Sequence, residues 1–480
     1  MKELDRLEQL VSKLDIEKRL NICEGLSKII LTNNKNDEYY YRNKKFLIRK
    51  FELSLLALHS VISSSKPWYN ITHEKWIKSS IQYIRNQDYI TTESFGFDPH
   101  KILSFLSFQQ INVQRDSRIL SYRYNYFYNF ENENLNMKDI FFNKFKISYI
   151  ELSQIVFSLW IYSSIEPQMS FNEYINKYIK EDIIDSISFI ISDVNQFKEE
   201  YEKFKSNNTI MKLAELNFLQ KYPIIKYNNK LYCPYLPFLI NSITTSLIFE
   251  LTRDNNNLRS KIGKNVLESY VYHLVLNSKV TNSLKIKKEF VYTKQKVLSA
   301  DVIIESENNI LFIDSKFFNQ SLKLRDYDLD EIDKIEDRLS DYIVQIYKQF
   351  NDYENNKMNG HLGYNKEYYG IVLIYDEYFS NRETVYNKAI EKLNKIENKK
   401  VNLELVKKRI LVMSIYSFEN ILFFSKGNVF DVLKEIFKQN NSHLNYLYPI
   451  NSSGKVEMSD YRDFNRDQIS EEYLKTITKL

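Results

Sequence analysis

The chain has 480 residues, of which 43% are hydrophobic, so it is long enough for two or three domains, each with a core of its own. Its formal net charge of +5 permits nucleic-acid binding but does not by itself indicate it. Two cysteines, Cys23 and Cys233, are too few for a disulfide framework, which favours a reducing, cytoplasmic location. The charged N-terminus predicts no signal peptide, and no apolar run reaches the length of about 18 residues that a membrane span needs.

The first part of the chain, residues 1–205, carries apolar residues at helical spacing. Leu4, Leu7 and Leu14 begin this pattern, and Leu159 and Trp160 belong to its most apolar stretch. We therefore expect a mostly helical domain that recognises nucleic acid or docks a partner. The predicted helices are 1–32, 45–64, 147–164, 170–192 and 193–205.

One segment of this part, residues 115–130, alternates aromatic and other side chains in the sequence RDSRILSYRYNYFYNF. The interpretation that we favour is a strand with one aromatic face. The alternative is a strip that stacks on bases and contacts phosphates, with Arg115, Arg118 and Arg123 as the nucleic-acid-binding residues.

Residues 206–257 are predicted to connect the two main parts. A helix is expected over 209–219 and another over 237–251. Between them, residues 222–234 form a short hairpin in which Asn228 and Asn229 supply the turn. A run of turn-forming residues, 254–257, marks the next boundary.

From residue 258 onwards the pattern alternates between helix and strand. Helices are expected over 261–276, 340–353 and 383–396, and strands over 284–292, 369–375 and 409–416. A hairpin within 297–318 supplies two more strands. The fold class is therefore α+β, with a helical N-terminal half and a C-terminal α/β domain, residues 258–480, around a central mixed sheet.

The hairpin carries ionisable residues where its two apolar runs begin and end. Asp301 opens the run Val-Ile-Ile, and the second run ends in Asp314-Ser315-Lys316. Side chains two residues apart in a strand point to one face, so Asp314 and Lys316 should project together and Asp301 can join them. Two buried carboxylates need a partner, and hard oxygen ligands favour Mg²⁺ or Mn²⁺. An ordinary edge hairpin with a surface ion pair is the alternative.

This arrangement resembles the PD-(D/E)XK nuclease superfamily, in which an Asp precedes a turn and an Asp-X-Lys follows on the next strand. Ala300 stands where the family motif has Pro. The resemblance covers residues 258–420 and implies a helix–three strands–helix–strand core. It also implies that Asp301 and Asp314 bind metal and that Lys316 orients water or stabilises charge. A Glu on the helix before the hairpin assists the metal in this family, and Glu268 is the matching residue.

A closer likeness is to McrC and LlaJI-type restriction subunits. Residues 313–318, IDSKFF, and the later IYKQF with Tyr353 are similar to their D-A-K-Y-Y and I-x-K-Q-x-x-Y patterns. The likeness implies that Gln349 and Lys348 lie over the active site, with Gln345 as a rival, and it gives Lys348 a nucleic-acid contact. Ser315, both phenylalanines and a charged insertion at 324–339 depart from the pattern.

The sequence thus predicts a Mg²⁺-dependent DNA endonuclease in bacterial restriction or anti-phage defence. Relatives work with a separate AAA-type NTPase subunit, and this chain has no phosphate-binding Walker A loop, because Ser453-Gly454-Lys455 lacks the upstream glycine. A homodimer is expected for double-strand cutting, and no membrane partner is expected. The alternatives are the same fold acting on RNA or branched DNA, and a subunit that binds DNA without cutting it.

Overall fold

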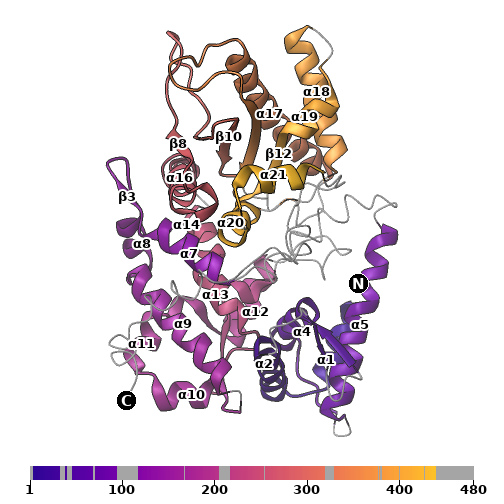
Figure 1. Ribbon diagram of the computed structural model, residues 1–480. Coiled ribbons are helices and arrows are strands. Elements are labelled where there is room, and N and C mark those ends of the chain that lie inside the picture. The colour runs from indigo at the N-terminus through magenta and orange to yellow at the C-terminus, as the bar shows by residue number, and fades with distance from the viewer. Residues whose placement is uncertain are drawn as a thin grey trace.

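The computed structural model describes residues 4–32, 38–40, 46–68, 71–94, 117–166, 168–204, 217–252, 255–318, 329–376, 378, 381–398, 401–425 and 427–438. Within these ranges no helix is long and apolar enough to cross a membrane. The protein is α+β, with a helical N-terminal part and a five-stranded mixed sheet in the C-terminal part, as the sequence predicts (Figure 1).

The sheet is built from β8 (Lys285–Lys288), β9 (Val302–Glu305), β10 (Asn309–Lys316), β11 (Glu367–Ile374) and β12 (Ile410–Ser414), in the spatial order β12-β11-β10-β9-β8. The first three strands pair antiparallel through hairpins. Strand β11 adds parallel to β10, and β12 adds parallel to β11. Parallel neighbours need crossover helices, and α17 and α18 supply them.

Helices cover both faces of this sheet, so its central strands are apolar on both sides. Ile303, Phe312 and Val372 belong to the core beneath α17 (Leu329–Glu354) and α18 (Arg382–Glu397). The alternate side chains Leu311 and Ile371 belong to the core on the opposite face. That face is covered by α16 (Glu268–Asn277) and α20 (Ile415–Phe424), and Figure 1 shows β10 between α16 and α17.

The remaining C-terminal helices frame this layer. Before α16 come α15 (Asn256–Lys261) and a π-helical segment, Ile262–Leu267. A 3-10 turn, Lys279–Thr281, follows α16. The others are α19 (Leu403–Arg409) and α21 (Val429–Lys438).

The part before residue 253 is built mainly from helices. Its helices are α1 (Leu4–Ser12), α2 (Ile16–Thr32), α4 (Lys50–Ile62), α5 (His73–Ser94), α7 (Ser117–Tyr128), α8 (Met137–Phe145), α9 (Tyr149–Ile165), α10 (Phe171–Tyr178), α11 (Glu181–Ser186), α12 (Val194–Phe204), α13 (Pro237–Ile243) and α14 (Thr245–Thr252), with 3-10 turns at Ser188–Ile190 and Phe218–Gln220. Its short strands are β1 (Glu38–Tyr40), β2 (Phe46–Arg49), β3 (Glu131–Asn132), β4 (Leu135–Asn136), β5 (Ile191–Asp193), β6 (Ile224–Tyr227) and β7 (Lys230–Tyr232).

The local predictions have different outcomes. The hairpin at 222–234 forms as β6 and β7, and Asn228 and Asn229 adopt the left-handed backbone that such a turn needs. The helix predicted over 45–64 begins later, because residues 46–49 form strand β2. The charged insertion at 324–339 largely joins α17, which begins at Leu329. The predicted helix over 209–219 falls mostly outside the described residues, as does Ser453-Gly454-Lys455.

The strand that we predict over residues 115–130 is wrong, because the described part of this segment forms helix α7. When aromatic residues stand at every second position, they also stand four positions apart, and residues four apart share one face of a helix. Tyr124 and Tyr128 therefore share one helical face and are fully buried. They belong to the same core as the sheet face beneath α16, so the packing crosses residue 205. The division into 1–205, 206–257 and 258–480 stays a prediction.

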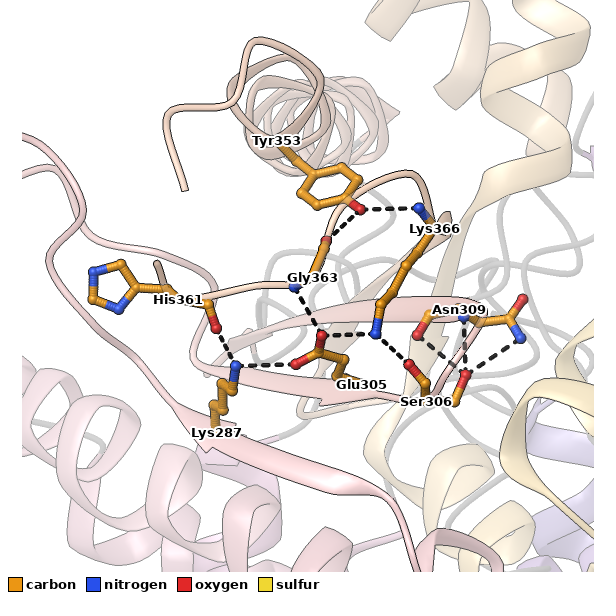
Figure 2. A network of polar contacts seen from close by, with 8 residues as sticks. All are labelled: Lys287, Glu305, Ser306, Asn309, Tyr353, His361, Gly363 and Lys366. Atoms are coloured by element: carbon orange, nitrogen blue, oxygen red, sulfur yellow. Dashed lines mark hydrogen bonds and ion pairs between the residues drawn. The ribbon is translucent and has the colours of Figure 1, made fainter. Parts of the chain in front are cut away.

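A polar network fastens the end of the sheet that lies opposite Asp301 (Figure 2). The carboxylate of Glu305, the last residue of β9, accepts hydrogen bonds from Lys287, Lys366 and the Gly363 backbone at 2.8–3.0 Å. The Glu305 side chain is only 5% exposed. Gly363 lies in the connection between α17 and β11, and the Tyr353 hydroxyl on α17 donates to the Gly363 carbonyl at 2.8 Å. The network therefore ties this connection to the hairpin of β9 and β10.

We expect Glu305→Gln to destabilise the protein at neutral pH by about 1–3 kcal/mol, because the amide keeps only one acceptor oxygen and has no charge to pair with the two lysines. Burial raises the pKa of Glu305, but hydrogen bonds from Lys366 and Lys287 outweigh burial and lower it to about 2. A carboxylate with a depressed pKa stabilises the fold above its ordinary pKa of 4.5 and loses that contribution as the pH falls towards 2. Urea unfolding of both proteins across this range should show the difference vanish in acid; a difference that is constant with pH would contradict it.

Candidate active site

Asp314 and Lys316 lie at the end of β10 in the row of side chains that faces α17, two and four residues after Phe312. The Lys316 Nζ atom lies 2.6 Å from the Asp314 Oδ2 atom, and their side chains are 24% and 15% exposed. Lys316 also lies over the ring of Tyr342 on α17, 5.4 Å from its centroid. The predicted common orientation of the two residues is therefore confirmed. Burial lowers the pKa of Lys316, but Asp314 outweighs it and the net shift is upwards.

Asp301 joins this pair from the residue before β9. Its Oδ2 atom accepts hydrogen bonds from the Ser315 backbone N–H at 2.6 Å and from the Ser315 hydroxyl at 2.5 Å. Ser315 therefore holds the first acid of the motif through two donors, a role that the sequence did not predict. Burial and, next, the nearby Asp314 carboxylate raise the pKa of Asp301 to about 6.

Glu268 reaches the same cluster from the first turn of α16, directly after the π-helical segment. Burial, then Asp301 and Glu289, raise its pKa to about 8. The neighbouring carboxylates contribute to this shift because like charges repel one another in a desolvated site. Single π-helical turns often occur at functional sites, because the extra residue re-aims the side chains that follow. The π-helical segment packs against β10 and α16 packs against β9, so the helix that carries Glu268 lies beside the strands of the hairpin.

Glycine at position 263 lets the π-helical segment approach β10. A Cβ atom at Gly263 would lie 2.8 Å from the Phe317 Cβ atom, closer than two carbon atoms can pack. Phe317 follows Lys316 directly. The close approach thus fixes the distance between the helix that carries Glu268 and the strand that carries the Asp-X-Lys motif.

Glu289 is a fourth carboxylate, which we did not predict. Its backbone N–H donates to the Asp301 carbonyl at 3.0 Å, because the β8–β9 pairing continues by one residue beyond the strands. Burial and the Asp314 carboxylate raise the pKa of Glu289, while Lys264 and Lys316 act in the opposite direction. The register of the β8–β9 pair would have revealed Glu289, but the sequence does not fix that register.

The Gln349 side chain contacts the connection between β8 and β9, and its role over the active site stays a prediction. Its Nε2 atom donates to the Leu298 carbonyl at 3.2 Å, on the β8–β9 connection. Among the described residues it makes no hydrogen bond with the four carboxylates. Lys348 and Gln345 are exposed on the surface of α17.

Of the three arginines that we predict to bind nucleic acid, the structure describes the side chain of Arg123 alone. Arg115 and the side chain of Arg118 lie outside the described residues. Arg123 is fully buried, and its guanidinium donates two hydrogen bonds to the Glu419 carboxylate, at 2.9 and 2.5 Å. The prediction that Arg123 contacts nucleic acid is therefore wrong, because the ion pair with Glu419 holds it inside the core.

The donor chemistry of this site fits a hard divalent cation, since Glu268, Asp301 and Asp314 offer carboxylate oxygens only. Neighbouring carboxylates help to raise the pKa of Glu268 and of Asp301, and such a cation would relieve this repulsion. In the described part of the chain, however, no three His, Cys, Asp or Glu side chains are gathered as a metal-ligand group. Asp314 is ion-paired with Lys316 and Asp301 is held by Ser315, so both acids already have protein partners.

The fold and the site together define an α+β protein in which a mixed sheet ends in an acid–acid–lysine cluster. No known family model matches the chain, and no curated protein matches its sequence. The resemblance to the PD-(D/E)XK superfamily therefore depends on the motif and on the order of the elements.

We expect Glu268→Gln to stabilise the metal-free protein at alkaline pH. A carboxyl group whose pKa is raised from 4.5 to about 8 favours the folded state when protonated, so stability declines as the pH rises between these values. Glutamine resembles the protonated acid at every pH. Thermal unfolding in EDTA should show no difference in acid and a growing advantage for the variant towards pH 8. Glu307→Gln, exposed in the β9–β10 turn, controls for the loss of one charge; an equal effect in both variants would contradict the prediction.

Proposed function

We propose that this protein is a Mg²⁺-dependent DNA endonuclease of the PD-(D/E)XK kind. The observation that carries the proposal is the meeting of Asp301, Asp314 and Lys316 at one end of the sheet, with Glu268 nearby. The element order α16, β8, β9, β10, α17, β11 supports it, because it follows the helix–three strands–helix–strand core that the resemblance implies.

The chain's own residues suggest a division of roles. Asp301, Asp314 and Glu268 would hold Mg²⁺ or Mn²⁺, which supplies charge neutralisation at the phosphate and lowers the pKa of water. The ion pair with Lys316 engages one oxygen of Asp314, so the other oxygen would hold the cation. The Lys316 ammonium would neutralise the negative charge that develops on the scissile phosphate. Water adds to phosphorus, the P–O3′ bond breaks and O3′ takes up a proton, which leaves a 5′-phosphate.

The resemblance to restriction subunits extends the proposal to bacterial restriction or anti-phage defence. The resemblance also implies that the protein works with a separate AAA-type NTPase subunit, and double-strand cutting would need a homodimer. A DNA-binding subunit that does not cut is the second candidate. The observation that favours it is the Asp314–Lys316 ion pair, which occupies a predicted metal ligand.

The test is cleavage of plasmid and phage DNA by the purified full chain with Mg²⁺, with Mn²⁺ and with EDTA. Metal-dependent cutting would support the proposal, and single-stranded RNA and branched DNA in parallel would define the substrate. Binding without cutting in every metal would favour the second candidate. If the protein neither binds nor cuts any nucleic acid, both candidate functions are refuted.

A further inference from the structure

The connection between β8 and β9 is a hairpin that extends past the sheet at the end where the carboxylates lie. We call residues 289–301 the hairpin arm. Its two sides pair through Glu289 with Asp301, Phe290 with Ser299 and Tyr292 with Val297, at 2.9–3.1 Å. Residues 293–296 close it in a tight turn, with Lys296 in the left-handed conformation. The arm thus begins at Glu289 and returns to Asp301, so its base belongs to the candidate active site.

Helix α17 anchors the arm next to its turn, at Tyr292 and Leu298. The Tyr292 hydroxyl donates to the Asp352 carboxylate at 2.6 Å, and Gln349 donates to the Leu298 carbonyl. The ring of Phe290 stacks on His361, with centroids 4.3 Å apart. An arm held by side chains from α17 and from the α17–β11 connection keeps a fixed direction relative to the sheet.

The tip of the arm combines exposed apolar side chains with exposed lysines. Val291, Val297 and Leu298 are 47%, 40% and 46% exposed. Lys294 and Lys296 are exposed in the turn between them. The base of the arm, in contrast, carries the carboxylates of Glu289 and Asp301. Within the arm itself, the lysines therefore lie at the turn and the carboxylates at the base.

We propose that the hairpin arm is the surface through which this protein holds duplex DNA, with its tip in a groove and its base at the scissile phosphate. Lys294 and Lys296 would contact backbone phosphates, and Val297 and Leu298 would contact bases or sugars. The proposal rests on the proposed function for the choice of nucleic acid.

Three general arguments favour a duplex as the occupant. A two-stranded β-ribbon is one of the two elements that the major groove admits. Proteins that bind the minor groove combine basic side chains with apolar side chains that insert between base steps. Protein–protein interfaces are instead depleted of lysine.

The experiment measures binding of a short fluorescent duplex to the full chain in EDTA, where the proposed cleavage is blocked, over a range of salt concentrations. The variants are Lys294→Gln with Lys296→Gln, and Val297→Ser with Leu298→Ser. The control is Lys144→Gln with Lys146→Gln. These two lysines have the same spacing and are exposed, Lys146 also has a left-handed backbone, and Figure 1 shows α8 well apart from β8.

We expect the lysine variant to bind several-fold more weakly and its log–log salt slope to fall by about 2, one unit for each lost phosphate contact. The apolar variant should also bind several-fold more weakly, but with an unchanged slope, because it removes no charge. The control should bind like the wild type. All these side chains are exposed, so the melting temperatures should agree with that of the wild type.

The outcomes separate this proposal from the proposed function. Wild-type affinity and slope in both arm variants of an active nuclease would overturn the role of the arm and leave the nuclease standing. Weakened binding by the arm variants of a protein that never cuts would support the arm and refute the nuclease. A wild type that neither binds nor cuts would overturn both.

Discussion

Replacement of Lys316 by alanine is expected to lower DNA cleavage by roughly a hundred- to a thousandfold, the effect of removing one group that stabilises transition-state charge. The fold should persist, because Lys316 lies at a strand end and is 24% exposed. Metal binding should also persist, because the variant frees Asp314 from its ion pair. Cleavage assays, together with Mn²⁺ titration followed by thermal unfolding, measure the two properties separately.

Asp314→Asn gives the complementary result. It removes a proposed metal ligand, so both cleavage and stabilisation by Mn²⁺ should be lost. If Asp314 served the fold alone, Lys316→Ala and Asp314→Asn would both lose cleavage, but the two variants would bind Mn²⁺ equally well.

Lys144→Ala is the matched control for the charge change in Lys316→Ala. Lys144 is exposed on α8, outside the proposed site, so its loss should leave cleavage close to that of the wild type. Full activity in Lys316→Ala, or a loss in Lys144→Ala as large as in Lys316→Ala, would contradict the assignment of Lys316.

The hairpin that carries the motif could be predicted from the sequence because its evidence is local. Its strands are short apolar runs around a polar turn, and the spacing of Asp314 and Lys316 determines their common face. Glu268 could be placed only through the resemblance, because helix phase depends on the π-helical segment before it. Nothing in local sequence marks that segment.

Helix α7 shows where local pattern fails. The alternation of Tyr122, Tyr124, Tyr126 and Tyr128 fits a strand, yet the same positions give two helical i, i+4 pairs. Tyr124 and Tyr128 pack inward, while Tyr122 and Tyr126 contact α16 near His273. Both periods fit when aromatic residues occupy every second position, so tertiary packing decides.

The partner of Arg123 could not be predicted either, since Glu419 lies 296 positions later in the chain. Only the folded chain brings α7 against α20. The contact of the Gln349 side chain could not be predicted for a related reason. Its sequence pattern places it on the correct helix, but the direction of its amide depends on the hairpin arm.

Arg123→Leu is expected to destabilise the protein by about 3–5 kcal/mol, the usual result of leaving one member of a buried ion pair without its partner. Arg123 and Glu419 are both fully buried, and the pair is bidentate. Tyr270 on α16 also donates to Glu419, at 2.6 Å. Urea unfolding measures the loss.

A double variant, Arg123→Leu with Glu419→Leu, should recover much of this stability, because no charge then stays buried alone. Lys138→Leu is the control, since Lys138 pairs with Glu131 on the surface and its loss should cost less than about 1 kcal/mol. A loss in Arg123→Leu no larger than in this control would contradict the prediction.

The same ion pair bears on how the chain is divided. Arg123 belongs to α7 in the N-terminal part, whereas Tyr270 lies two residues after Glu268 on α16. Arg123 also lies over the ring of Tyr375, which packs on Phe317, the residue after Lys316. A fragment that begins at residue 258 would leave Glu419 buried without Arg123. We therefore expect the C-terminal part, expressed alone, to unfold at lower urea than the full chain and to regain stability when Glu419 is replaced by leucine.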